Sequence, residues 1–289
     1  MFGVGEYGYI EMCQDILENG VYRKPDDEDG RYELFDYTLR FDNMQNGHIP
    51  LLTTKFVPFK SLAVEMLWFI SGSQRTDLLK KYNVPIWNTW ENEDGVVGPL
   101  YGFQWRHWRI DPPLRHQFDG ADEIDQLKNT IESLRSRPEA RSHMITAWRP
   151  DHLKSMAIKP CHVLLQFYRV GDSVSLSLYQ RSCDTFLGVP FNIAQYSVLL
   201  HIVAHVIGCK PDTFTWHGGD VHIYENHVDQ IEEQMDRRPV GFPKLKINNA
   251  TPDIDQISFE DLELSGYNPY PRLKGDISPQ GTPGHVVEL

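Results

Sequence analysis

Apolar residues recur at helical spacing in four segments of the chain. Residues 6–20 (EYGYIEMCQDILENG) have this spacing and end in Asn-Gly, which is typical of the end of a helix. Residues 61–72 (SLAVEMLWFISG) and 194–208 (AQYSVLLHIVAHVIG) predict two more apolar helices, each closed by glycine. Residues 122–135 (DEIDQLKNTIESLR) predict an exposed amphipathic helix with acids in the first turn and arginine at the end.

Two other regions have the pattern of β-strands. Residues 32–41 (YELFDYTLRF) alternate, and residues 161–183 form two β-rich runs around a Gly-Asp-Ser turn. Helical and strand segments do not follow one another in regular βαβ order, so the pattern favours an α+β fold. No repeat or composition break divides the chain. We therefore expect one domain over residues 1–289, with an irregular tail rich in Pro and Gly from about residue 272.

Composition narrows the class of protein. The 289 residues are 40% hydrophobic and 12% aromatic, which is enough to fill the core of a globular protein. A formal net charge of -12 argues against a DNA partner, because non-specific nucleic-acid binding needs an excess of Lys and Arg. No apolar run approaches the roughly 18 residues that span a bilayer, and the first residues do not resemble a signal peptide. We expect no membrane partner and a cytoplasmic protein.

No metal site is expected. His201 and His205 are spaced as zinc ligands can be, yet the glutamate of an HExxH motif is absent, so packing or surface histidines are favoured. The acidic stretch at 24–31 is interpreted as a solvated loop, since Pro25 falls where a calcium loop has its first Asp. The cysteines show no CxxC pair and are expected to be thiols; they are Cys13, Cys161, Cys183 and Cys209.

Two of these cysteines have an arginine nearby in the sequence or in the predicted hairpin. Cys161 stands in Pro160-Cys161-His162, and Cys183 stands in Arg181-Ser182-Cys183-Asp184. A guanidinium stabilises a thiolate over a thiol and so favours a nucleophile at neutral pH. The local sequence leaves either cysteine as the candidate.

Eight segments, in order and at similar spacing, resemble the successive signature blocks of the thymidylate synthase family. They are PLLTTK (50–55), EMLWFISG (65–72), GPLYGFQWRHW (98–108), PCH (160–162), YQRSCDTFLGVPFNIAQY (179–196), GGDVHIYENH (218–227), FPKLKI (242–247) and GYNPYP (266–271). The resemblance runs from about residue 6 to residue 272. It implies a thymidylate synthase-like fold, in which a mixed β-sheet packs with helices and one face of the sheet forms a dimer interface.

The resemblance implies catalytic roles for six residues. Cys161 matches the nucleophile that adds to C6 of uracil, which leaves Cys183 as a neighbour. Glu65 matches a buried acid that relays protons, and burial in an apolar helix should raise its pKa. Tyr101 matches the tyrosine implicated in removing the C5 proton. The set is completed by His162, Arg181 and Asn192.

The resemblance also implies how nucleotide and folate bind. Asn192 matches the amide that pairs with O4 and N3–H of uracil, where an aspartate would suit cytosine. His222 and Tyr224 match the pair that holds the sugar 3′-hydroxyl. The remaining nucleotide-binding residues are Gln180, Arg181, Ser182, Asp184 and Arg141. The folate-binding residues are Ile86, Trp87, Asn88, Asp184, Leu187, Gly188 and Phe191.

The family is a dimer whose partner subunit donates phosphate-binding arginines, a role that Arg141 fits. Two cations of the usual phosphate site are missing here, because Ser142 and Asp26 stand at positions where arginine is usual. Arg23 or Arg31 is a candidate replacement. The tail is longer than usual, and Val286 and Val287 are its candidate residues for closing over the folate.

The resemblance implies methylation of dUMP to dTMP with 5,10-methylenetetrahydrofolate as co-substrate and no metal. Hydroxymethylation of dUMP or another pyrimidine nucleotide is the alternative, since poor closure would let water add to the same intermediate. The retained Trp87 favours methylation, whereas the altered tail and the missing cations favour the alternative. A nucleotide-binding relative without turnover is a third possibility, against which the retained catalytic residues argue.

Overall fold

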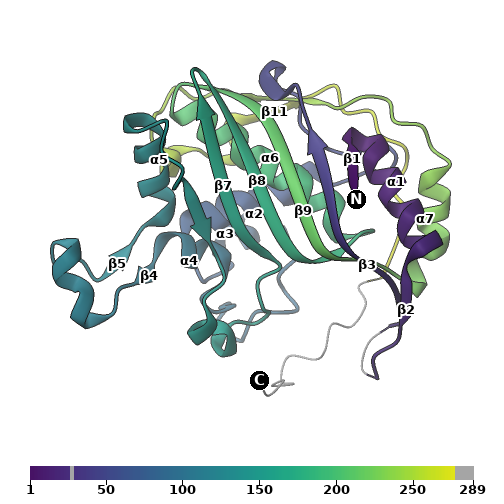
Figure 1. The fold of residues 1–289 in the computed structure, drawn as a ribbon, viewed down its shortest axis with the longest axis horizontal. Coiled ribbons are helices and arrows are strands. Elements are labelled where there is room, and N and C mark those ends of the chain that lie inside the picture. The colour runs from purple at the N-terminus through teal and green to yellow at the C-terminus, as the bar shows by residue number, and fades with distance from the viewer. Residues whose placement is uncertain (27–28, 277–289) are drawn as a thin grey trace.

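A seven-stranded mixed sheet forms the centre of the computed structural model, which describes residues 1–26 and 29–276 (Figure 1). The strand order is β1-β3-β9-β8-β7-β6, and β2 pairs with β3 at its side. The pairs β1·β3 and β8·β9 are parallel, and the other pairs are antiparallel. The strands are β1 (Phe2–Val4), β2 (Val21–Arg23), β3 (Arg31–Phe41), β6 (Met144–Thr146), β7 (His162–Val170), β8 (Ser173–Asp184) and β9 (Lys210–Tyr224).

Helices α2 and α6 lie behind the strands β7, β8 and β9 in Figure 1, and the opposite face of these strands is open to the viewer. The helices are α1 (Gly5–Asn19), α2 (Phe59–Ser71), α3 (Asp77–Lys81), α4 (Tyr101–Arg106), α5 (Gln126–Ser136), α6 (Gly188–Val206) and α7 (Val228–Met235). The 3₁₀ turns are η1 (Met44–Asn46), η2 (Pro112–Phe118), η3 (Pro150–Ser155), η4 (Glu225–His227), η5 (Ile254–Gln256) and η6 (Phe259–Asp261). Two small sheets pair β4 (Trp108–Arg109) with β5 (Glu123–Ile124) and β10 (Lys244–Ile247) with β11 (Leu262–Ser265).

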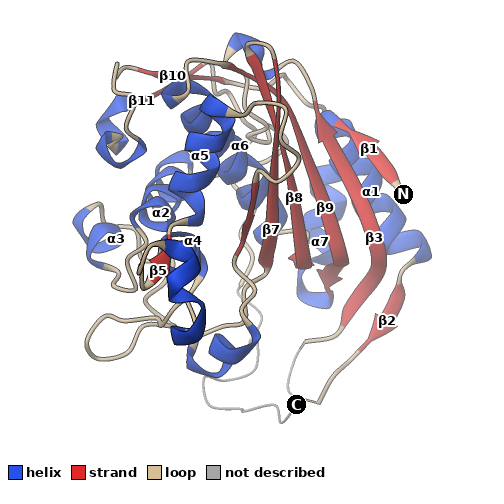
Figure 2. Ribbon diagram, turned by 60° about the vertical axis from the view of Figure 1, so that its left-hand side comes forward, coloured by secondary structure: helices blue, strands red, loops and turns tan. Residues whose placement is uncertain are grey.

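Helix α6 is the apolar centre of the molecule. By length and composition it could cross a membrane, but 89% of the window that passes this test is buried inside the protein. It connects β8 to β9, the parallel pair that needs a crossover. Figure 2 shows the helices gathered on one side of the strands. These are the features of the core helix of an α+β protein, and the fold class expected from the sequence is confirmed.

Most predicted elements lie where the pattern placed them, and two boundaries were wrong. Helix α5 begins at Gln126 instead of residue 122, because residues 123–124 pair with β4 and Asp125 caps the helix by accepting from the Lys128 amide at 2.8 Å. Its first turn therefore contains no acid. Helix α6 begins at Gly188 instead of residue 194, and it includes Pro190 in its first turn, where no intrahelical N–H is needed.

The end of the described chain has no regular structure over residues 271–276. Val286 and Val287, the residues expected to close the folate site, lie outside the described residues.

Candidate active site

A cavity of about 270 Å³ lies where α2, β8 and the start of α6 meet. Most of the residues singled out in the sequence line it, and three others do so as well: Phe69, Trp90 and Ile158. The expected residues on its wall are Glu65, Ile86, Trp87, Tyr101, Cys161, His162, Gln180, Ser182, Asp184, Leu187, Gly188, Phe191 and Asn192. Arg181, His222, Tyr224, Arg141 and Asn88 are not on this wall.

Cys161 immediately precedes β7, and its backbone amide donates to the hydroxyl of Tyr101 at 3.1 Å. Tyr101 is held at φ 28°, a conformation that a side chain with Cβ rarely adopts. The next residue, Gly102, packs against α2 so closely that an added Cβ would lie 1.8 Å from the carbonyl oxygen of Phe69. The close contact between α4 and α2 therefore places the phenol beside the cysteine.

The charge state of Cys161 depends on two opposing effects. Burial raises the pKa of the thiol, while the guanidinium of Arg181 lowers it by a smaller amount. Arg181 donates to the carbonyl oxygens of Pro160 and Lys159, both at 2.9 Å, and so fixes the segment that carries Cys161. Arg181 therefore acts in the expected direction, but it offsets only part of the effect of burial, and the pKa of Cys161 is raised overall.

The amide of Asn192 has a defined orientation. The indole N–H of Trp216 can only donate, so the oxygen of the Gln180 amide must accept this bond at 2.9 Å. The nitrogen of Gln180 then donates to the Asn192 Oδ1 at 3.0 Å. Asn192 consequently presents one amide nitrogen as donor and an oxygen with a second lone pair as acceptor.

Glu65 is buried in α2 and accepts hydrogen bonds from the Trp87 indole and the Gln195 amide. Burial raises its pKa to about 7, and the two donors only partly oppose this shift. The carboxyl group is thus poised to gain or lose a proton near neutral pH, as expected. Gln195 was not singled out in the sequence, where nothing local separates it from the other buried residues of its helix.

His162 packs among aromatic rings, with its ring centre 5.0 Å from the ring centres of both Tyr101 and Tyr196. Burial lowers the pKa of His162 to about 4, so the imidazole is neutral at pH 7. It can orient neighbours there, but it cannot supply a positive charge.

A row of polar side chains extends from the cavity across the sheet. Ser182 is paired with Asp220, and Asp184 is paired with His222 on the neighbouring strand β9. The Nδ1 of His222 lies 2.9 Å from the Asp220 carboxylate, so Nδ1 carries the proton. In the neutral ring Nε2 of His222 is then the acceptor, and this atom is buried without a hydrogen-bond partner within the described part of the chain.

Farther along the same row, one acid holds two arginines. Glu33 lies opposite His222 and Arg31 lies opposite Tyr224 in the β3·β9 ladder. Glu33 pairs with Arg23 at 3.1 Å and with Arg31 at 2.5 Å. Both candidate replacements for the missing phosphate cations are therefore engaged by the same carboxylate.

The residues at the usual arginine positions lie on the surface. Asp26 and Ser142 are exposed, and so is Arg141. Arg141 is not among the residues that line the cavity.

The other half of the cavity is apolar. Ile86, Trp87, Leu187 and Phe191 form its wall. One oxygen of Asp184 accepts from the amides of Phe186 and Leu187, at 3.0 and 3.1 Å, which fixes this carboxylate at the edge of the wall. Asn88 is exposed and makes no part of the wall.

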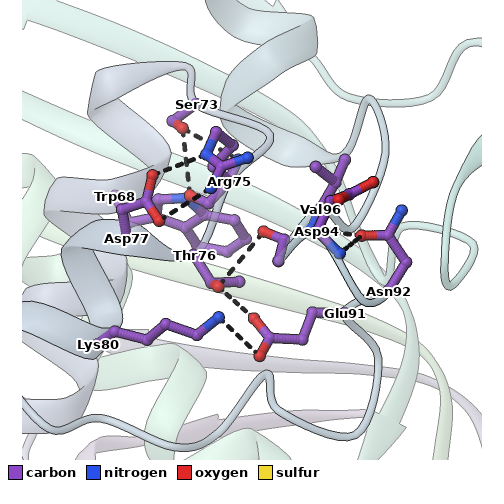
Figure 3. Close-up of polar contacts among 11 residues, drawn as sticks. Trp68, Ser73, Arg75, Thr76, Asp77, Lys80, Glu91, Asn92, Asp94 and Val96 are labelled. Carbon is purple, nitrogen blue, oxygen red and sulfur yellow. Dashed lines mark hydrogen bonds and ion pairs between the residues drawn. The ribbon is translucent and has the colours of Figure 1, made fainter.

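A polar network supports the segment that carries Trp87 and Trp90. Figure 3 shows Thr76 and Lys80 pointing toward Glu91, and Lys80 pairs with it at 2.8 Å. The Trp68 indole donates to the Arg75 carbonyl at 2.8 Å, which ties the same loop to α2. This network holds the tryptophan segment against the helix that carries Glu65.

Two other candidates, Cys183 and His201, make contacts that are typical of buried structural residues. Cys183 is fully buried, with Sγ 3.4 Å from the Gln180 carbonyl, and it does not line the cavity. His201 is buried and donates through Nδ1 to the Ser197 carbonyl at 2.8 Å. The described residues contain no group of three or more His, Cys, Asp or Glu side chains arranged to hold a metal ion.

Comparison with known proteins identifies the family of this chain. The family model for thymidylate synthase matches residues 7–279. Thymidylate synthases of two strains of Buchnera aphidicola subsp. Acyrthosiphon pisum, APS and Tuc7, are each 42% identical over 270 residues, covering 93% of this chain and 98% of their own length. The chain belongs to the thymidylate synthase family.

Proposed function

We propose that this enzyme methylates dUMP to dTMP, using 5,10-methylenetetrahydrofolate as co-substrate. The relatives that match nearly the whole chain are named thymidylate synthases, which favours methylation over the hydroxymethylase alternative. One observation within the cavity carries the proposal most directly: a nucleophile, a fixed amide and a titratable acid line the same space, namely Cys161, Asn192 and Glu65.

Asn192 is assigned to recognition of the base. Its amide nitrogen donates to O4 of uracil, and its oxygen accepts from N3–H with the lone pair that Gln180 leaves open. Cytosine presents an amino group and an unprotonated N3, so both contacts would be mismatched. A site with a fixed polar group discriminates strongly, because the wrong base leaves that group unpaired.

Cys161 is assigned as the nucleophile. Its sulfur forms a bond to C6 of the uracil ring, and the electron pair of the C5–C6 double bond moves toward C5 and O4. Because the thiol form is favoured at neutral pH, the thiol must give its proton to water as the bond forms. Arg181 offsets part of the cost of the developing thiolate and holds Cys161 in place through the carbonyls of Pro160 and Lys159.

Glu65 and Tyr101 are assigned to proton transfer. With a pKa of about 7, Glu65 can give a proton to O4 and take it back at the same pH. The Tyr101 hydroxyl, held by the Cys161 amide, is positioned to assist removal of the C5 proton. The folate supplies the one-carbon unit and the reducing hydride, and the wall of Ile86, Trp87, Leu187, Gly188 and Phe191 excludes water around it.

The polar row is assigned to the sugar and phosphate. The unpaired Nε2 of His222 accepts from the 3′-hydroxyl, with Tyr224 beside it, which favours a 2′-deoxyribonucleotide. Ser182 and Arg181 are assigned to the phosphate. Arg31 is the replacement we favour for the arginine missing at position 26, because its strand position adjoins Tyr224, whereas Arg23 is more exposed.

We also infer a homodimer that uses the open face of the sheet. Large apolar side chains are exposed on its strands, among them Phe35 at 78% and Tyr168 at 63% exposed. Large apolar side chains that are exposed on several strands of one sheet support a protein interface there. The partner would cover this face and bring Arg141 to the phosphate. The continuous hydrophobic core supports one domain over the matched residues, and the burial of α6 supports a soluble enzyme. A cytoplasmic location remains part of the proposal.

The test is a side-by-side assay of dUMP and dCMP with 5,10-methylenetetrahydrofolate. Methylation releases dihydrofolate, which absorbs in the near ultraviolet, whereas hydroxymethylation returns tetrahydrofolate. We expect dihydrofolate and dTMP in equal amounts from dUMP. A 5-hydroxymethyl nucleotide without dihydrofolate would replace this proposal with the alternative, and no product at all would favour a binding protein.

A further inference from the structure

The last described residues form an irregular segment, residues 267–276, which we call the C-terminal strap. It crosses the loop at residues 52–57. The Tyr267 hydroxyl donates to the Leu52 carbonyl at 3.0 Å and accepts from the Val57 amide at 2.8 Å. The Tyr270 amide donates to the Thr53 carbonyl at 2.7 Å. These bonds fix the first half of the strap.

The second half is tied at two points. Arg237 donates to the Pro271 carbonyl at 2.9 Å and also to the Thr54 carbonyl at 2.8 Å. The final tie is a hydrogen bond of 2.8 Å between Nε2 of His227 and the Asp276 carbonyl. A carbonyl can only accept, so Nε2 carries the proton. His227 is fully buried and does not belong to the cavity wall.

The strap packs directly on Phe186 at this point. The rings of His227 and Phe186 are 4.9 Å apart. A Cβ added to Gly275 would lie 2.6 Å from the Phe186 ring and 2.9 Å from His227 Nε2. Because side chains in a close-packed interior leave no such room, only glycine fits between these two rings.

Phe186 links the strap to the folate side of the cavity. Its amide donates to Asp184, and its carbonyl accepts from the buried Lys55, whose ammonium group lies 3.6 Å from the centre of the Phe186 ring. Asp184 and Leu187, which precede and follow residues 185–186 in the sequence, both line the cavity. A displacement of Phe186 would therefore move the carboxylate and the apolar wall together.

We propose that His227 is a positioning residue for the folate half of the site, acting through Phe186. Its hydrogen bond to Asp276 and its contact with Phe186 hold the strap against the wall, so that Asp184 and Leu187 keep their places. This inference rests on the proposed function. The uracil half, read by Asn192 and Gln180, is held by separate contacts and does not depend on the strap.

The test compares His227→Leu with His227→Gln. Glutamine keeps an N–H donor near the position of Nε2, whereas leucine fills the space without a donor. Loss of a neutral buried hydrogen bond gives an effect of about 3- to 10-fold. We expect His227→Leu to raise the KM for folate by that factor and to leave the KM for dUMP within about 2-fold. His227→Gln should restore most of the loss.

Gly275→Ala disturbs the same contact from the side of the strap. It keeps the proposal testable if a His227 variant fails to fold. We expect it to raise the KM for folate selectively as well. Hydrogen exchange of a peptide covering residues 267–276 should accelerate in His227→Leu and Gly275→Ala, but not in His227→Gln.

Equal values for the leucine and glutamine variants would overturn the proposal, and so would an equal rise in both KM values. Either result would assign His227 to general stability. An inactive wild-type enzyme, in contrast, would count against the proposed function itself.

Discussion

The indole of Trp216 donates to the side-chain oxygen of Gln180 at 2.9 Å, and this bond determines which way two amides face. Asn192→Asp would replace the amide donor with a second acceptor and mismatch O4 of uracil. The change removes one hydrogen bond to uracil and supplies one to the amino group of cytosine. At about 1 kcal/mol for each bond, the ratio of kcat/KM for dCMP to that for dUMP should rise by roughly 10- to 100-fold.

Trp216→Phe serves as the matched control, since it removes the bond that fixes Gln180 without changing Asn192. It should lower discrimination between the two nucleotides without reversing it. A wild-type enzyme that prefers dCMP would contradict the assignment of Asn192.

Cys161→Ser should lower kcat by at least roughly a thousandfold, because a hydroxyl is a far weaker nucleophile than a thiol in the same place. Cys183→Ser should cost far less activity, since Cys183 is buried behind the cavity wall. The measurement is kcat for dihydrofolate release, with circular dichroism as the check on folding. The opposite ranking would move the nucleophile to Cys183.

Glu65 makes stability depend on pH. Its pKa is raised to about 7 in the folded protein from an ordinary value of 4.5, so the folded state binds more protons than the unfolded state between these values. Stability must then fall as pH rises through this window, by up to about 3 kcal/mol from this one group.

Glu65→Gln lacks this titration. The difference in unfolding free energy between variant and wild type should therefore shift in favour of the variant between pH 5 and pH 8, as measured by denaturant titration. A difference that does not change with pH would mean that Glu65 is charged throughout. Residual kcat in the variant should be low, because glutamine cannot relay a proton.

Glu33→Gln should lower the KM for dUMP, because its carboxylate competes with the nucleotide phosphate for Arg23 and Arg31. Arg31→Ala should raise that KM by roughly 10- to 100-fold, since a charge-assisted hydrogen bond contributes about 1.5–3 kcal/mol. Arg23→Ala is the matched comparison, with a smaller effect expected from its greater exposure.

Competitive inhibition by inorganic phosphate gives a second readout for these variants. Its inhibition constant should follow the same order, whereas inhibition by 2′-deoxyuridine, which lacks the phosphate, should not change. If Glu33→Gln weakens phosphate binding instead, the acid serves to orient the arginines.

Arg141 can be tested by mixing two inactive proteins. In a dimer of Cys161→Ser and Arg141→Ala subunits, one of the two sites has an intact cysteine together with an intact partner arginine. Random exchange of subunits should restore about a quarter of the wild-type activity. Light scattering should verify the mass of a dimer in the mixture. If activity does not recover although dimers are present, Arg141 belongs to the site of its own subunit.

The elements predicted best from the sequence are those whose periodicity is local. Helices α1 and α2 and the strands β3, β7 and β8 all appear near their predicted places. Strand β9 was not predicted, because its 15 residues include Pro211, Gly218 and Gly219 and many polar side chains. It is a strand because β3 and β8 pair with it on both sides, and such long-range pairing leaves no local signal.

In the candidate site, too, long-range contacts were not predicted from the sequence. The cavity residues were named from their resemblance to a family, not from their spacing. Their supporting contacts were not predicted: Gln195 reaches Glu65 across 130 positions of sequence, and Glu33 collects two arginines at positions 23 and 31. The pKa of Cys161 beside Arg181 also depends on the burial of the thiol, which cannot be read from the sequence.

The crossover from β8 through α6 to β9 has a consequence for how the chain acquires its structure. During synthesis, α6 is complete before any of β9 has been made, so the part of its surface that packs on β9 stays uncovered until that strand follows. Parallel pairing across such a crossover forms slowly, because loop closure must precede the contacts that compensate it. Until β9 docks, this uncovered apolar part of the helix is a site for aggregation or chaperone binding, so chaperone supply should limit the yield of soluble enzyme.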